Sequence, residues 1–267
     1  MTSQSSRFVG SIPEHYDSGL GPHIFTDYAA DIARRAADYK PSSVLELAAG
    51  TGIVTRKLRN LLPVGTTLLA TDLSPPMLEQ AKKKFAEDEN VRFEVVDASS
   101  LPYDPPLFDV VVCQFGVMFF PDKLKSYSEV LRVLKPGGHY LFNVWDCWAA
   151  NPFAEIVYET IAEVFPDDPP GFYRVPFGYH DIDAINASLR EAGFTSITAK
   201  TLPLRSRILS AELLARGIVF GSPLYEEIVS RNGDLVAIHS RVQKVLESQF
   251  GNEMPIQAIV FGAESSP

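Results

Sequence analysis

Apolar residues recur at two different periods along the chain, and the two periods alternate. An apolar residue at every third or fourth position predicts a helix, and proline or glycine ends several of these segments. Alternating or continuous apolar runs between them predict strands. The predicted helices cover about residues 24–39, 53–62, 75–85, 124–134, 151–165, 182–192 and 210–250, and the predicted strands cover about 43–47, 66–71, 91–96, 108–114, 139–145, 194–207 and 257–261.

Strands and helices alternate regularly between residues 43 and 145. Such alternation is typical of a parallel sheet covered by helices on both faces, so we expect an α/β domain. Beyond Trp145 the rhythm changes, and the helical segment 210–250 stands between the last two predicted strands. We expect it to form a lid over the carboxyl ends of the strands, where ligands of such sheets bind.

Composition and charge narrow the class of protein. The chain has 46% hydrophobic and 21% charged residues, which is ordinary for a globular protein. Its net charge of −9 disfavours nucleic acid as a partner. No run approaches the roughly 18 apolar residues of a membrane span, and residues 1–6 lack the apolar core of a signal peptide. We therefore expect a cytoplasmic protein without a membrane span, and the sequence leaves homodimer formation open.

Cysteine and histidine usage adds little chemistry. Cys113 and Cys147 are too few for a disulfide framework and suit a reducing cytosol. The five histidines show no spacing typical of metal ligands, so we expect no metal site.

A segment of small residues, Ala48–Gly52, follows the first strand of the α/β region. Glycines at such a turn let the backbone approach a ligand closely. The segment lacks the three glycines of a dinucleotide fingerprint, and no GKS or GKT sequence follows to form a triphosphate loop. It suits a ligand that approaches the backbone without presenting a phosphate, and a tight turn without a ligand is the alternative.

Carboxylates end the next two strands. Asp72 follows Glu46 by 26 residues and can accept hydrogen bonds from both hydroxyls of a ribose. Asp97 can accept from the exocyclic amine of an adenine while the N–H of Ala98 donates to a ring nitrogen. Either aspartate alone would be explained as a turn residue or a helix cap. Three strand-ending sites on one edge of a sheet are hard to explain as caps alone.

Together these segments resemble the successive motifs of class I S-adenosylmethionine-dependent methyltransferases, in the branch that contains quinone-biosynthesis and other small-molecule enzymes. The resemblance covers about residues 44–145, with a weaker echo at 181–193, and its motifs are Val44–Gly52, Ala70–Leu78, Val96–Ala98 and Glu129–Gly138. It implies a Rossmann-like sheet of seven strands with helices on both faces, an antiparallel last strand at about 256–263, and the helical lid inserted between the last two strands.

The chain is then expected to be one methyltransferase domain, residues 1–267. In that division an amino-terminal segment, 1–42, covers the cofactor, and 43–146 bind it. The lid comprises 147–180 and 208–252, and the remaining core comprises 181–207 and 253–267.

The resemblance also implies a role for individual residues toward S-adenosylmethionine. Glu46 and the glycine turn would lie against the methionine part, Asp72 would hold the ribose, and Tyr16 would fold over the cofactor. Leu73 and Met77 would pack on the adenine, and Gln114 and Phe115 would face the methionine and the sulfonium. The family often has glycine where this chain has Ala48, so we expect an altered contact there rather than lost binding. The implied cofactor-binding residues are Tyr16, Glu46, Ala48, Gly50, Gly52, Asp72, Leu73, Met77, Asp97, Ala98, Gln114 and Phe115, although core packing would equally explain Leu73 and Met77.

Methyl transfer from a sulfonium is an in-line displacement with a good leaving group. Alignment and exclusion of water can achieve much of the catalysis, and a general base matters only for a poor nucleophile. His15, Tyr16 and His180 are the candidates for a catalytic role, and either histidine is readily explained as a surface or packing residue. The sequence therefore leaves the catalytic residues unassigned.

Aromatic residues are concentrated in the predicted lid, most densely between residues 169 and 179. This stretch is too dense to be wholly buried, so it predicts a pocket for a small apolar or aromatic acceptor. The expected function is methyl transfer to such an acceptor. The alternatives are a non-catalytic module that binds S-adenosylmethionine, and an NAD-dependent oxidoreductase, which the missing GxGxxG pattern disfavours.

Overall fold

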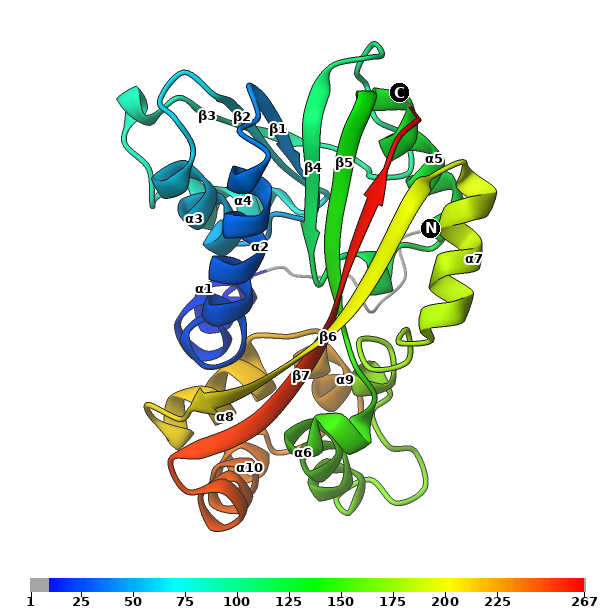
Figure 1. Cartoon of the computed structure of the whole chain (residues 1–267). Helices are drawn as coiled ribbons and strands as arrows, with labels where there is room; N and C mark the ends of the chain where they lie inside the picture. The colour runs from blue at the N-terminus through cyan, green and yellow to red at the C-terminus, as the bar shows by residue number, and fades with distance from the viewer. Residues whose placement is uncertain (1–9, 267) are drawn as a thin grey trace.

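Seven strands form one mixed sheet at the centre of the protein (Figure 1). The computed structural model describes residues 10–266. The strand order is β3-β2-β1-β4-β5-β7-β6, with β7 antiparallel to both of its neighbours and the other pairs parallel. The strands are β1 Ser43–Glu46, β2 Thr67–Asp72, β3 Val91–Val95, β4 Phe108–Gln114, β5 Leu134–Trp145, β6 Thr195–Arg207 and β7 Glu253–Glu264. The Rossmann-like sheet with an antiparallel last strand is thus confirmed.

Helices cover the sheet and form a second layer beyond the carboxyl ends of its strands (Figure 1). The α-helices are α1 Ile12–His15, α2 Thr26–Asp38, α3 Ile53–Leu61, α4 Pro75–Lys82, α5 Lys123–Val133, α6 Pro152–Ala162, α7 Ile182–Ala192, α8 Ala211–Phe220, α9 Leu224–Ser230 and α10 Leu235–Phe250. A π-helix, η2, spans Tyr16–Phe25, and short 3₁₀ turns are η3 Glu87–Glu89, η4 Val117–Phe119, η5 Trp148–Ala150 and η6 Phe172–Arg174. Within residues 10–266, no helix combines the length and the apolar character that crossing a membrane requires.

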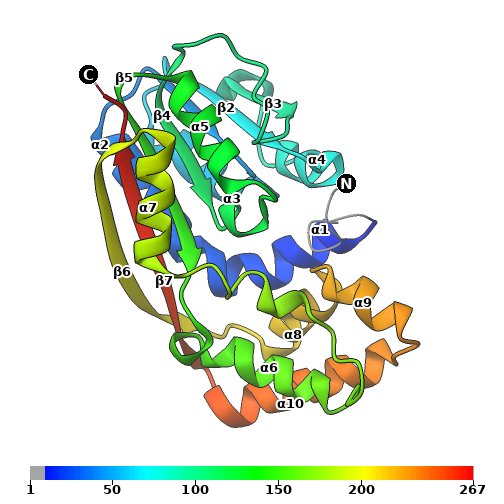
Figure 2. The same cartoon turned by 90° about the vertical axis from the view of Figure 1, so that its right-hand side faces the viewer.

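The central strands are buried on both faces, so successive residues of one strand belong to different cores. Val110 and Val112 pack in the core that α2 and α3 cover. Val111 and Cys113 belong to the larger core on the opposite face, where α5 and α7 pack (Figure 2). This arrangement explains why the sequence of β4 is apolar almost throughout.

Strands β6 and β7 extend past the rest of the sheet as a long antiparallel ribbon, paired from Thr195 with Glu264 to Arg207 with Glu253. Helices α8, α9 and α10 connect their far ends (Figure 1). Together with α6 they form the layer that we call the lid. The predicted insertion of helices between the last two strands is confirmed.

The amino-terminal helices differ from the prediction of one helix that starts near residue 24. The chain is already helical from Ile12, and the wide turns of η2 accommodate Pro22 without interrupting the helix. Segment α1–η2 crosses between the sheet and the lid (Figure 2). There η2 meets α8 backbone to backbone: a Cβ added to Gly217 would lie 2.7 Å from the carbonyl carbon of Gly19. Only glycine permits this approach, so the lid and η2 pack as one layer.

Two local features of the second half bear on the prediction. Pro136–Gly138 were expected to separate a helix from a strand. They lie inside β5 instead, where the pairing jumps from Phe108–Leu134 to Val110–His139, so the segment forms an irregularity in the strand. Asp181 caps α7, since its side chain accepts a hydrogen bond from the N–H of Ala184 at 3.0 Å.

Candidate active site

Two cavities meet between the sheet and the lid. The glycine-turn cavity, about 320 Å³, lies beside residues 48–51 at the carboxyl ends of β1 and β4. The aromatic cavity, about 530 Å³, lies between this edge and the lid. Tyr16, Phe25 and Phe115 line both cavities, so the two spaces adjoin at these three side chains.

The glycine turn has a left-handed backbone at three positions. Ala48, Gly50 and Gly52 have φ angles of +51°, +56° and +78°, and Gly52 precedes the first residue of α3. A residue with a Cβ pays roughly 1–2 kcal/mol in this region, which explains why glycine suits position 48. Ala48 is accommodated because its neighbour Gly116 has no side chain: a Cβ at 116 would lie 2.5 Å from the Cβ of Ala48.

Glu46 ends β1 and lines the glycine-turn cavity while only 2% of its surface is exposed. Among the residues the structure describes, its oxygen Oε2 has no hydrogen-bond partner. Burial raises the pKa of Glu46 to about 8; hydrogen bonding from Thr55 opposes this change, and the nearby Asp72 carboxylate adds to it. A buried carboxylate with an unused oxygen at an open cavity fits the ammonium group of a ligand.

Asp72 ends β2 and fixes the glycine turn from outside the cavity. Its Oδ2 accepts a hydrogen bond from the N–H of Gly50, and its Oδ1 accepts one from the N–H of Ser74, both at 2.8 Å. Burial nevertheless raises the pKa of the carboxyl, with the two hydrogen bonds opposing that change. Each oxygen retains a lone pair, so the predicted contact with a ribose is compatible with this geometry.

The residues predicted to surround the adenine do not line either cavity. Asp97 is exposed and accepts hydrogen bonds from the N–H and the hydroxyl of Ser99 at 2.8 and 2.7 Å, which is the turn role that the sequence left as the alternative. Leu73 is 47% exposed, whereas Met77 is buried near Gly50. Ala98 packs against the larger core. The adenine site thus stays a prediction.

Gln114 and Phe115 leave the end of β4 and lie in the wall of the glycine-turn cavity. The side-chain amide of Gln114 donates to the backbone oxygen of Phe25 at 3.3 Å. The ring of Phe115 stacks on that of Trp145, with 4.1 Å between centroids and an interplanar angle of 8°. Sheet and amino-terminal segment are therefore in contact across this wall.

The amino-terminal segment is fastened over the glycine turn next to Tyr16. Asp17 accepts a hydrogen bond from the hydroxyl of Thr51 at 2.6 Å and forms an ion pair with Lys84. Burial, together with the negative charges of Asp72 and Asp17, raises the pKa of Tyr16, so its hydroxyl stays protonated and can donate a hydrogen bond.

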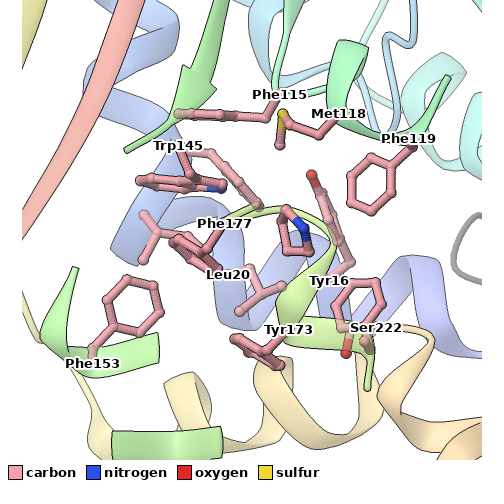
Figure 3. Close-up of a pocket in the computed structure, with 14 residues that line it drawn as sticks. Tyr16, Leu20, Phe115, Met118, Phe119, Trp145, Phe153, Tyr173, Phe177 and Ser222 are labelled. Atoms are coloured by element: carbon pink, nitrogen blue, oxygen red, sulfur yellow. The ribbon is translucent and has the colours of Figure 1, made fainter. Parts of the chain in front are cut away.

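The aromatic cavity has no charged residue among those that line it within the described chain. Its walls come from η2, β5, the lid and the stretch around η6, and Figure 3 shows Phe115 and Trp145 on one side with Tyr173 and Ser222 opposite. The lining residues are Tyr16, Leu20, Ile24, Phe25, Phe115, Met118, Phe119, Trp145, Phe153, Phe172, Tyr173, Pro176, Phe177 and Ser222. The predicted aromatic stretch therefore contributes to a cavity.

Neither histidine candidate reaches the cavities. His15 packs against the ring of Phe220 at 5.6 Å, and neither it nor His180 belongs to the lining of either space. Sequence reasoning missed Phe25 and Ser222, because η2 and the α8–α9 connection carry no motif. Across residues 10–266, no group of His, Cys, Asp or Glu side chains is arranged to hold a metal ion.

Comparison with known proteins agrees with this geometry. The sequence profile of the methyltransferase domain family matches residues 44–138. A demethylmenaquinone methyltransferase from Clavibacter sepedonicus is 28% identical over 183 residues, which cover 63% of this chain and 72% of that protein. One from Deinococcus radiodurans is 38% identical over 135 residues, which cover 50% of this chain and 56% of that protein.

A solved structure shows the same fold over the whole chain. It is phosphoethanolamine N-methyltransferase 2 from Haemonchus contortus, in complex with phosphomonomethylethanolamine and S-adenosylhomocysteine. The TM-score is 0.65 at 17% identity, and the match covers 100% of this chain and 60% of that one. The family match shows a methyltransferase domain over the glycine turn and the carboxylate-ended strands, and together with these likenesses it supports a class I S-adenosylmethionine-dependent methyltransferase.

Proposed function

We propose that the protein transfers the methyl group of S-adenosylmethionine to a small apolar or aromatic acceptor bound in the aromatic cavity. The observation that carries this proposal is the junction of the two cavities. Tyr16, Phe25 and Phe115 line both, so a methionine moiety in one space and an acceptor in the other would meet there.

The residues at the glycine turn fit this cofactor. The unpartnered oxygen of Glu46 would bind the ammonium group, and Asp72 would bind the ribose from the position where it already fixes Gly50. When bound, the cofactor supplies a methyl group on a positively charged sulfur. Tyr16 lies at the junction as a neutral phenol that can donate a hydrogen bond to an acceptor oxygen or nitrogen.

Alignment, rather than proton abstraction, is the catalytic contribution that this site offers. No residue lining the aromatic cavity in the described chain is a histidine or a carboxylate, so no conventional general base faces an acceptor there. The buried aromatic walls exclude water and restrict the orientation of a flat ligand. Orientation of two reactants can lower a barrier by roughly 7–11 kcal/mol, which leaves much of the rate to geometry.

Three further features of the proposal concern partners and location. The net charge of −9 and the uncharged lining of the aromatic cavity argue against a nucleic-acid acceptor. Cys113 and Cys147 are free, which suits a reducing compartment such as the cytoplasm. The division of the chain into a covering segment, a cofactor core and a lid also stays a proposal.

The test is acceptor-dependent release of S-adenosylhomocysteine. The panel should hold neutral aromatic hydroxyl and amine compounds and a demethylmenaquinone analogue, with charged amines and carboxylates of equal size as controls. We expect turnover with neutral aromatic members, and we expect His15→Ala and His180→Ala to retain it because neither residue lines the cavities. Binding of S-adenosylhomocysteine without turnover on any acceptor would support the non-catalytic module. Binding of NAD in its place would support the oxidoreductase.

A further inference from the structure

One buried asparagine outside both cavities forms hydrogen bonds with two residues that line them. Asn143 lies in β5 with 1% of its surface exposed. Its side-chain oxygen Oδ1 accepts a hydrogen bond from the N–H of Phe115 at 3.0 Å, and the same N–H lies 3.1 Å from the backbone oxygen of Asn143. Phe115 has a φ of +50°, a left-handed conformation that a phenylalanine rarely adopts. Asn143 thus holds Phe115 in a backbone conformation that is unfavourable in itself.

The same amide is linked to the amino-terminal segment. Asn143 Nδ2 donates to Gln114 Oε1 at 3.4 Å, and Gln114 Nε2 donates to the backbone oxygen of Phe25 at 3.3 Å. Phe115 and Phe25 are two of the three residues that line both cavities. A continuous chain of side-chain amides therefore connects two sides of the junction through Asn143.

The ring of Phe115 follows its backbone because its surroundings leave little freedom. It stacks on Trp145 (Figure 3). It also meets Tyr28 edge-on at 5.4 Å and lies 5.7 Å from the ring of Phe25. A relaxed backbone at Phe115 would move the ring out of the stack with Trp145. The geometry of the junction and the environment of the Trp145 indole would then change together.

We propose that Asn143 is a positioning residue for methyl transfer, which sets the opening between the two cavities by holding Phe115 and, through Gln114, Phe25. That a methyl group crosses this opening rests on the proposed function. The position of Phe115 does not rest on it, and it can be measured in the ligand-free protein.

Trp145 provides the readout. The chain has two tryptophans, so a Trp148→Phe background leaves Trp145 as the only tryptophan, whose emission is separated from that of the tyrosines by selective excitation. In that background we expect Asn143→Ala to shift the Trp145 emission of the folded, ligand-free protein. We also expect it to raise the dissociation constant of S-adenosylhomocysteine, measured by calorimetry, about tenfold, because Gln114 and Phe115 form part of the glycine-turn cavity. Asn143→Leu should do the same while filling the space, and it serves if the alanine variant does not fold.

Asn151 offers a matched control. It is fully buried, its oxygen accepts from the N–H of Gln257 at 2.8 Å, its amide donates to Asp146, and it lines neither cavity. Asn151→Ala should lower the melting temperature and leave the dissociation constant as in the parent; its emission is not compared, because Asn151 also bonds the backbone oxygen of Asp146, next to Trp145. Asn143→Asp keeps an oxygen for Phe115 and should preserve the emission.

Two results would overturn the proposal. One is a folded Asn143→Ala or Asn143→Leu variant whose emission matches that of the parent and whose dissociation constant matches that of Asn151→Ala, since a merely structural asparagine would behave in that way. The other is an emission shift in Asn143→Asp as large as that in Asn143→Leu. If the parent itself did not bind S-adenosylhomocysteine, the proposed function would fail, while the emission comparison would still decide the role of Asn143.

Discussion

Cofactor binding should be coupled to the ionisation of Glu46. This carboxyl is buried beside the glycine turn, its Oε2 lacks a partner among the described residues, and its pKa is raised to about 8. A bound ammonium group would stabilise the carboxylate and lower that pKa. Binding would therefore release a proton below pH 8, and affinity would increase with pH.

The magnitude follows from the fraction of Glu46 that is ionised before binding. With a pKa of about 8, roughly 1% is carboxylate at pH 6, about 9% at pH 7 and about 50% at pH 8. If only the ionised form binds tightly, the affinity should rise about ninefold from pH 6 to 7 and about fivefold from pH 7 to 8. Glu46→Gln cannot ionise, so its affinity should be lower at pH 8 and nearly independent of pH.

Calorimetry with S-adenosylhomocysteine, from pH 6 to 8 in buffers of different ionisation enthalpy, measures both the affinity and the protons released. The glutamine variant supplies the baseline for any titration of the ligand itself. A wild-type protein whose affinity is flat over this range, or whose pH dependence persists in Glu46→Gln, would refute the assignment of Glu46 to the ammonium group.

The free energy of unfolding of the ligand-free protein should also depend on the ionisation of Glu46, but it should decrease with rising pH where the affinity for the cofactor increases. The folded-state pKa of Glu46 lies above the unfolded value of 4.5, so the folded state binds the proton more tightly. Stability from this group is complete below the unfolded pKa, and it is lost as the pH rises toward about 8. Thermal melts at pH 8 should accordingly show Glu46→Gln to be more stable than the wild type.

Three other changes test separate parts of the site. Ala48→Gly should stabilise the fold by about 1 kcal/mol in denaturant unfolding, because it relieves the left-handed backbone of an alanine. It should also partly rescue Gly116→Ala, whose added Cβ would lie 2.5 Å from that of Ala48, and strictly additive effects of the two substitutions would contradict this. Asp72→Ala should weaken S-adenosylhomocysteine binding by about 1–3 kcal/mol in calorimetry, and unchanged affinity would remove Asp72 from the site. Burial lowers the pKa of His23, whose Nε2 accepts a hydrogen bond from the N–H of Ser210. The stability of the wild-type protein should therefore fall as the pH drops below 6.5, and the melting temperature of His23→Gln should depend less on pH.

The cofactor side of the fold could be predicted from sequence because its signals are local. Each strand of the parallel region is a short apolar run, and the small residues and carboxylates follow directly at strand ends. Glu46 and Asp72 were found in this way, and the structure places both at the glycine turn. The sequence around Asp97 has the same local pattern, but it does not distinguish a carboxylate that faces a ligand from one that accepts hydrogen bonds from its own turn, as Asp97 does.

The junction could not be predicted, because no local pattern encodes it. Segment η2 carries Gly19, Gly21 and Pro22, which argue against a regular helix, and it forms a π-helix that packs closely against α8. Asn143 sits in a strand that reads as apolar, where a single polar residue gives no sign of its partner. Its importance comes from contacts with residues 28 and 29 positions earlier in the chain, which only the sheet register brings together.

The two halves of the site have different freedom to change. The glycine-turn cavity is built on strand ends of the central sheet, where any movement would disturb a core buried on both faces. Much of the aromatic cavity is built by η2, α6 and the segments around η6 and α8, on a layer that the β6–β7 ribbon carries away from the sheet. If the aromatic cavity holds the acceptor as proposed, substitutions at Phe153, Tyr173 or Ser222 should alter the choice of acceptor without disturbing the cofactor side. Phe115 cannot be changed so freely, because its ring borders both spaces and its backbone is held by Asn143 from within the sheet.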